Sequence, residues 1–222
     1  GDMPVQPRKE AFVLKDDKSP GALAALPDEA LIDAVQRRTF RYFWEGADAA
    51  SGLALDRRTL VRATGEDVAD ERVAIGGTGF GIMALIVAVE RGWVSRDAAL
   101  ERLGRMRDAL FRARRYHGTF PHFMDGASGE TIPMSPKDDA GDLVETSFLC
   151  MGLLCARQYF SEDTATVRRL GGHIDTLWHE VEWNWFTQGG QDVLYWHWSP
   201  NHGWAMNHRI RGWNESLITY LL

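Results

Sequence analysis

The sequence feature that most constrains the fold is an alternation between two kinds of predicted helix. Some segments carry apolar side chains on one face and charges on the other, whereas others are mainly apolar. The amphipathic segments are residues 27–45, 95–114 and 164–182, and the apolar segments are residues 78–91, 136–160 and 213–222. Because an amphipathic helix covers a core and an apolar helix is buried within one, the pattern predicts an inner row of helices behind an outer row.

The lengths of the connections give this arrangement a direction. Short turns follow two of the apolar segments, at residues 92–94 and 161–163, and long segments precede all three, at residues 46–77, 116–134 and 184–212. Short connections make antiparallel neighbours, so the three long segments emerge at the same end. We therefore predict an all-α fold, an (α/α)6 toroid or barrel with its cleft built from the long loops at one end.

The 222 residues supply three helical pairs, which is about half of such a toroid. The last helix ends at Leu222 without a capping residue, so we expect further helices in the natural protein. Residues 1–25 are expected to be an N-terminal extension or linker, and residues 26–222 the N-terminal part of one domain.

Composition excludes several classes of partner. A net charge of −6 and a pI near 5.6 give no basic surface for nucleic acid. No apolar run reaches the roughly 18 residues that a membrane span needs. The two cysteines, Cys150 and Cys155, lie on different faces of one predicted helix, so we expect neither a disulfide between them nor a Cys-x-x-Cys metal site.

An acidic cluster stands at the start of the fourth predicted helix. If the helix includes residues 136–160, then Asp138, Asp142 and Glu145 share one face at positions i, i+4 and i+7. Like charges at this spacing destabilise an isolated helix, so they need an explanation. One is helix capping, either by Ser135 with Asp138 or by Asp142 with Glu145. The other is a catalytic or ligand-binding cluster.

Two further features favour the second explanation. Glu215 opens the last apolar helix, which the predicted fold places beside the fourth, and six of the nine tryptophans lie between residues 178 and 204. Tryptophans can stack on sugar rings, although they can also fill a core. Two carboxylates facing an aromatic cleft are what glycoside hydrolysis requires, one to protonate the leaving oxygen and one to activate water or attack the anomeric carbon.

Other motifs carry less weight. The glycine-rich residues 76–81 follow no predicted strand and lead to no Gly-Lys-Ser/Thr, so we interpret them as close helix packing rather than a phosphate loop. The loop histidines have no metal-ligand spacing and are expected to bond sugar hydroxyls. We predict no metal and no cofactor. No Gly-x-Ser-x-Gly nucleophile elbow occurs.

Three stretches resemble a known family. They read GDLVETSFL at residues 141–149, QDVLYWHWSP at residues 191–200 and RGWNESLITY at residues 211–220, with FGIMAL and VERGW near residues 80–93 as a fourth element. Over about residues 26–222 the chain resembles the glucoamylase-like domain family, within the branch that contains bacterial endo-β-1,2-glucanases. Members of that family form an (α/α)6 toroid roughly twice as long as this chain.

The resemblance implies roles for individual residues. Glu215 matches the glutamate proposed as general acid, and Asp138, Asp142 and Glu145 match the acidic cluster, while the identity of the base stays open. The expectation is an endo-acting β-1,2-glucanase with an inverting mechanism and an oligo- or polysaccharide substrate. The expected substrate-binding residues are Trp196, Trp198, Trp204, Trp213, His122, Arg57, Asn214 and Arg211.

Two alternatives remain open at this point. The same scaffold could carry an exo-acting β-glucosidase or glucoamylase-type enzyme or a transglycosylase, or it could be a non-catalytic glycan-binding protein. We also expect a monomer that is periplasmic or secreted, with a signal peptide removed.

Overall fold

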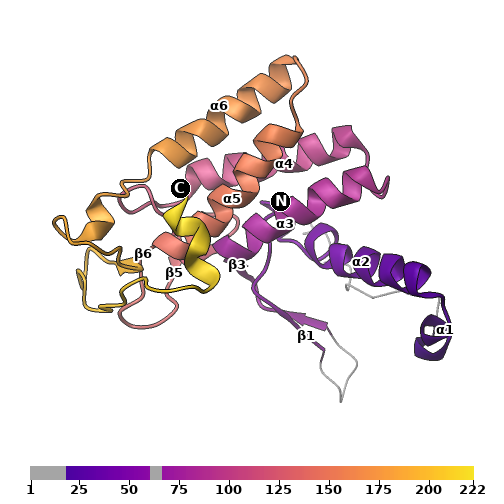
Figure 1. The fold of residues 1–222 in the computed structure, drawn as a ribbon, viewed down its shortest axis with the longest axis horizontal. Helices are drawn as coiled ribbons and strands as arrows, with labels where there is room; N and C mark the ends of the chain where they lie inside the picture. Colours follow the sequence, from indigo (N-terminus) through magenta and orange to yellow (C-terminus); the bar gives the residue numbers. More distant parts are fainter. Residues whose placement is uncertain (1–18, 61–66) are drawn as a thin grey trace, which may run out of the picture.

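The computed structural model describes residues 19–60 and 67–222, so most of the expected N-terminal extension lies outside the described residues. The helical elements are α1 (Pro20–Ala24), α2 (Asp28–Trp44), α3 (Ile75–Glu90), α4 (Arg96–Arg112), α5 (Leu143–Tyr159), α6 (Ala165–His179) and the 3-10 helices η1 (Trp185–Thr187) and η2 (Glu215–Tyr220). The strands are β1 (Arg58–Leu60), β2 (Asp67–Ala69), β3 (Arg72–Ala74), β4 (Phe123–Asp125), β5 (Thr131–Ile132), β6 (Gly141–Asp142) and β7 (His197–Trp198). Figure 1 shows that the helices form the body of the molecule.

The helices alternate between an inner and an outer row, as the sequence predicts. The inner helix α3 packs against its neighbour α5, and α5 packs in turn against η2, whereas α2, α4 and α6 cover them. Glycines let the inner backbones touch: a Cβ on Gly79 would lie 2.1 Å from the carbonyl oxygen of Phe148, and one on Gly152 would lie 2.2 Å from that of Gly79. The glycine-rich segment is therefore a helix-packing motif, and the all-α toroid-like architecture is confirmed.

The long connections meet at one end of the helices. Strand β3, in the first long connection, pairs antiparallel with β4 in the second connection, and β4 also pairs with β5. Strand β6, at the end of the second connection, pairs antiparallel with β7 in the third connection. The labelled strands β3, β5 and β6 lie together beside the helices in Figure 1. The prediction that all three long segments emerge at the same end is thus correct.

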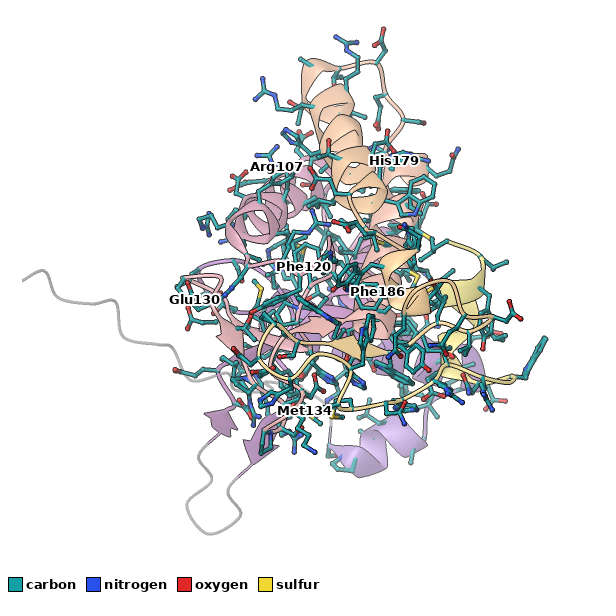
Figure 2. The ribbon with its side chains drawn as sticks, turned by 90° about the vertical axis from the view of Figure 1, so that its left-hand side faces the viewer. Arg107, Phe120, Glu130, Met134, His179 and Phe186 are labelled. Atoms are coloured by element: carbon teal, nitrogen blue, oxygen red, sulfur yellow. The ribbon has the colours of Figure 1, made fainter. Side chains whose placement is uncertain are left out.

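Two hydrophobic clusters hold these layers together. The larger one lies between the helices and includes Ile82, Leu103, Leu149 and Ile174. The smaller one, built on Leu143, Val144, Val181, Phe186 and Ile210, lies between the start of α5 and the tryptophan-rich third connection. Figure 2 shows Phe120 and Phe186, both almost fully buried, in the interior where helices and loops meet. The loop layer therefore has a hydrophobic cluster of its own.

Several predicted boundaries are wrong, and the fourth helix is the most important case. It begins at Leu143, not near Pro136, because residues 135–138 form a tight turn in which Asp138 donates its N–H to the Ser135 carbonyl. The backbone N–H groups of Asp142 and Leu143 bind the carbonyls of Phe120 and Trp196. Tertiary hydrogen bonds therefore replace the expected first turns of the helix.

The other differences are smaller. Helix α3 starts at Ile75, three residues early, and α6 stops at His179, before the expected Glu182. The sixth predicted α-helix is the 3-10 helix η2, a form typical of short helical segments. Among the described residues, no helix combines the length and apolarity that crossing a membrane requires. Cys150 and Cys155 are both free thiols.

Candidate active site

The acidic residues come together at the N-terminal end of α5, although not as a helical stripe. Asp138 lies in the turn before β6, Asp142 caps α5 by accepting the N–H of Glu145 at 2.8 Å, and Glu145 lies in the first turn. Of the two helix-capping pairs that the sequence predicts, the structure contains Asp142 with Glu145. Ser135 and Asp138 instead form an isolated bridge within a turn.

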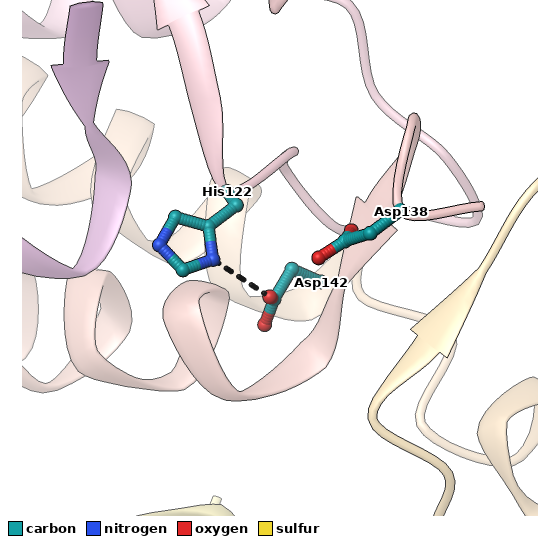
Figure 3. Close-up of side chains that lie close together, drawn as sticks. All are labelled: His122, Asp138 and Asp142. Atoms are coloured by element: carbon teal, nitrogen blue, oxygen red, sulfur yellow. Dashed lines mark ion pairs between the residues drawn. The ribbon is translucent and has the colours of Figure 1, made fainter. Parts of the chain in front are cut away.

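Asp142 is the centre of this cluster. It is completely buried, and its second carboxylate oxygen, Oδ2, has no hydrogen-bond partner within residues 19–60 and 67–222. That oxygen lies 3.4 Å from Nδ1 of His122, the contact drawn in Figure 3, and 3.7 Å from Nε2 of His197. Nε2 of His197 also lies 3.4 Å from Oδ2 of Asp138. Asp142 therefore serves two purposes, because one oxygen holds the helix and the other faces the cluster.

Glu145 reaches across to the neighbouring inner helix. Its Oε2 accepts the N–H of Gly76 at 2.8 Å, at the start of α3. A Cβ on Gly76 would lie 2.2 Å from that oxygen, so this glycine admits the carboxylate. Sequence reasoning recognised the glycine motif as packing but missed this second role, since nothing near Gly76 in the chain indicates an acidic partner.

Burial changes the acidity of two of the carboxyls. It raises the pKa of Asp138 to about 6, with help from the negative charge of Asp142 and against the opposing effect of His122. It likewise raises the pKa of Glu145 to about 7, again with Asp142 adding to the effect. Close carboxylates in a dry site cannot all ionise together. The cluster can therefore hold a proton near neutral pH while also presenting a charged carboxylate, which is the pairing that acid–base catalysis needs.

The pKa values of the two histidines beside Asp142 shift in opposite directions. Burial alone would lower the pKa of His122, but its contact with Asp142 and the charges of Glu145 and Asp138 outweigh that effect and raise it. Burial dominates at His197, whose pKa is lowered. His122 is thus the more easily protonated neighbour of the carboxylates and His197 the less easily protonated one.

A neighbouring carboxylate fixes the turn that carries Asp138. Asp139 accepts a hydrogen bond at 2.8 Å from the side-chain amide of Asn201, in the third long connection. Ser199 in the same loop accepts the N–H groups of Asn201 and His202. These bonds tie the turn to the tryptophan-rich segment, so the position of Asp138 depends on residues far away in the sequence.

Glu215 occupies a different environment from the other three acids. It is exposed at the start of η2, and among the described residues it makes no hydrogen bond or ion pair. Asn214 caps η2 by accepting the N–H of Ser216 at 3.0 Å and donates its amide to the Arg211 carbonyl, so its side chain has a structural role. Element η2 is joined to α5 by a buried hydrogen bond of 2.9 Å between Thr219 and Ser147.

The tryptophans expected to bind substrate differ among themselves. Trp196, Trp198 and Trp204 are partly buried and pack against the smaller core cluster, and the rings of Trp198 and Trp204 also contact Trp185. Trp196 stacks at 4.6 Å on His208 and lies nearly parallel to His197. Trp213 is 89% exposed and is the one of the four that presents most of its ring to solvent.

The two predicted arginines lie apart from one another. Arg57 is exposed and forms an ion pair with its neighbour Asp56. Arg211 lines an open cavity of about 630 Å³ between the third long connection and η2, together with Gln191, Asp192 and Tyr220. Neither the three clustered acids nor Glu215 lines that cavity.

The cluster is also close enough to bridge a cation. His122, Asp138 and Asp142 each offer one atom, and these three atoms lie within 4.8 Å of one another. The sequence gives no sign of this, because the three residues have no metal-ligand spacing. The expectation that the site works without a metal stays a prediction.

Comparison with known proteins adds an independent line of support. No protein-family model matches the chain. An exo β-1,2-glucooligosaccharide sophorohydrolase (non-reducing end) from Parabacteroides distasonis is 44% identical over 199 residues, which are 89% of this chain and 26% of that protein. The endo-β-1,2-glucanase of Chitinophaga pinensis, solved with sophorotriose and glucose, matches with a TM-score of 0.82 and 44% identity over 89% of this chain and 47% of its own. A candidate glucoamylase from Bacteroides fragilis matches with a TM-score of 0.82 and 48% identity over 88% of this chain and 46% of its own.

The matches first indicate a class of protein. The relatives are glucoamylase-like proteins, as the sequence motifs indicate. Within that class, two of the three are hydrolases named for β-1,2-linked glucans or glucooligosaccharides. The chain spans about half the length of the two solved relatives and a quarter of the sophorohydrolase. The resemblance to the β-1,2-glucanase branch is therefore confirmed over nearly the whole chain.

Proposed function

We propose that this chain supplies the acidic side of a glycoside hydrolase site that cleaves β-1,2-glucans. The observation that carries the proposal is the buried cluster of Asp138, Asp142 and Glu145, which can hold a proton and a negative charge side by side. The hydrolase relatives support the reaction class and the linkage.

In this proposal Glu215 is the general acid, and a carboxylate of the cluster activates water for an inverting attack. The exposure of Glu215 suits a group that gains its surroundings only when a sugar binds beside it. His122 offsets part of the charge on Asp142, and Trp213 and Arg211 offer exposed groups for contacts with sugar rings and hydroxyls. We further propose that the protein acts as a monomer and in the periplasm or outside the cell.

The test uses the protein as its gene encodes it. It is incubated with linear β-1,2-glucan and, separately, with starch, beside Glu215→Gln. Loss of a general acid lowers turnover by roughly 10²- to 10⁴-fold, so products from β-1,2-glucan that vanish in the variant support substrate and acid together. Cleavage of starch alone would contradict the linkage. Binding of β-1,2-glucan without turnover would favour a glycan-binding protein.

The same experiment separates two modes of cleavage. One relative is an endo-acting enzyme and another releases sophorose from the non-reducing end, at equal identity to this chain. Endo action predicts a spread of oligosaccharides at early times. Exo action predicts one short product throughout.

A further inference from the structure

A buried histidine next to the acidic cluster has one ring nitrogen without a hydrogen bond among the described residues. His197 is only 9% exposed, and within the described part of the chain its Nδ1 has no partner. Its Nε2 points at two carboxylates, 3.4 Å from Oδ2 of Asp138 and 3.7 Å from Oδ2 of Asp142. Both separations exceed an ordinary hydrogen bond. Since burying an unpaired polar group costs stability, the position of this imidazole needs an explanation.

The backbone holds His197 firmly in this position. In the pairing of β6 with β7, His197 is directly opposite Asp142, so the two side chains lie on the same face of the ribbon. The ring lies parallel to that of Trp196 at an interplanar angle of 12°. His208, with its ring centre 5.8 Å away, is a further neighbour. The ring therefore has little freedom to turn away from the carboxylates.

The surroundings also decide which ring nitrogen carries the proton. Nε2 is the ring nitrogen that faces Asp138 and Asp142, whereas Nδ1 faces no partner among the described residues. A neutral imidazole has one N–H, and carboxylates accept hydrogen bonds. The proton therefore belongs on Nε2, facing Asp138 and Asp142, and Nδ1 is left as the unpaired acceptor.

We propose that His197 is a positioning residue of the hydrolase site, whose Nε2–H lies between Asp138 and Asp142 and fixes the two carboxylates relative to each other. Its effect on turnover rests on the proposed function, but the contact itself does not. Contacts of this kind are often long in the free enzyme and shorten when substrate binds. His122, which also contacts Asp142, has a different task, because its side chain is 25% exposed and its pKa is raised rather than lowered.

Two amide variants separate positioning from packing. His197→Gln places an amide N–H near the position of Nε2, whereas His197→Asn is one methylene shorter and cannot reach the carboxylates. We expect His197→Asn to lower kcat roughly 10- to 100-fold with little change in KM, and His197→Gln to recover most of that loss. His179→Gln, at an exposed histidine of α6 that lies outside the cluster, is the matched control and should retain kcat. Equal losses in the Gln and Asn variants would overturn the proposal, as would an Asn variant with normal kcat.

A spectroscopic measurement tests the contact without any turnover. In protein labelled with ¹⁵N-histidine, the His197 signals are assigned by their loss in His197→Gln. We expect the Nε2–H tautomer, with a resonance that shifts in Asp138→Asn. An Nδ1–H tautomer would overturn the proposal even if β-1,2-glucan is hydrolysed. If the tautomer is as expected but no glucan is cleaved, the proposed function fails and the positioning contact stands.

Discussion

Two inner elements, α5 and η2, begin in similar ways and yet present their acids very differently. Each follows a long connection and starts with a capping side chain, Asp142 or Asn214, and each has a glutamate in its first turn. At α5 the second and third connections cover the acids and bury them. At η2 the glutamate is exposed. The comparison teaches that burial by remote segments, rather than the local motif, sets the acid chemistry.

The largest effect should come from removing the negative charge of Asp142 at the buried N-terminal end of α5. Asn caps helices about as well as Asp, so Asp142→Asn should keep the fold while hydrolysis of β-1,2-glucan falls by roughly 10²-fold or more. Asp142→Ala should lose the activity and, in addition, about 1 kcal/mol of unfolding free energy. Activity assays and denaturant unfolding of both variants check this. An active Asp142→Asn would remove the buried cluster from the mechanism.

The second effect concerns pH and stability. The folded pKa of Glu145, about 7, lies above its ordinary value of 4.5, so the folded state binds this proton more tightly than the unfolded chain. The unfolding free energy should therefore decrease as pH rises from about 4.5 to about 7, by as much as about 3 kcal/mol. Glu145→Gln should abolish the part of this decrease above about pH 6, whereas below that pH the raised pKa of Asp138 contributes a decrease of its own. Glu215→Gln is the matched control and should retain the full decrease, so equal slopes in both variants would contradict the comparison.

The third effect tests what holds η2 against α5. Thr219→Val removes the buried hydrogen bond to Ser147 and should cost about 1 kcal/mol of unfolding free energy. Hydrogen exchange should then quicken in η2 more than in α5. Thr176→Val, on the exposed face of α6, is the control and should change stability by less than about 0.5 kcal/mol.

The smallest effect is expected at the exposed glutamate. Since Glu215 makes no hydrogen bond or ion pair among the described residues, Glu215→Gln should change the unfolding free energy by no more than about 0.5 kcal/mol. Thermal or denaturant unfolding measures this directly. A larger loss would show that Glu215 is held by contacts comparable to those of Glu145.

Local patterns and connection lengths predicted the broad design. The alternation of amphipathic and apolar segments predicted the two rows of helices, and the short turns after α3 and α5 predicted that the loops meet at one end. The capping pair of Asp142 and Glu145 was available from spacing alone. These features depend on neighbours in the chain, which a single sequence displays.

The fine geometry of the site depends on contacts between remote segments and was missed. Asp138 lies in a turn because carbonyls of Phe120 and Trp196 bind the backbone before α5. His197 joins the cluster through strand pairing with Asp142, and no local signal marks that register. Trp198 and Trp204 pack in part against the smaller core cluster, a contact that the sequence does not show, and their role in binding sugar stays a prediction.

The contact between Gly79 and Gly152 has a consequence for variation in this protein. Because main-chain atoms meet there, the separation of α3 and α5 is set by the backbone rather than by the bulk of side chains. That separation also fixes the reach of Glu145 to Gly76. Many residues of the helical core can therefore change without moving the acids, whereas a single methyl group at either glycine would push the two helices apart.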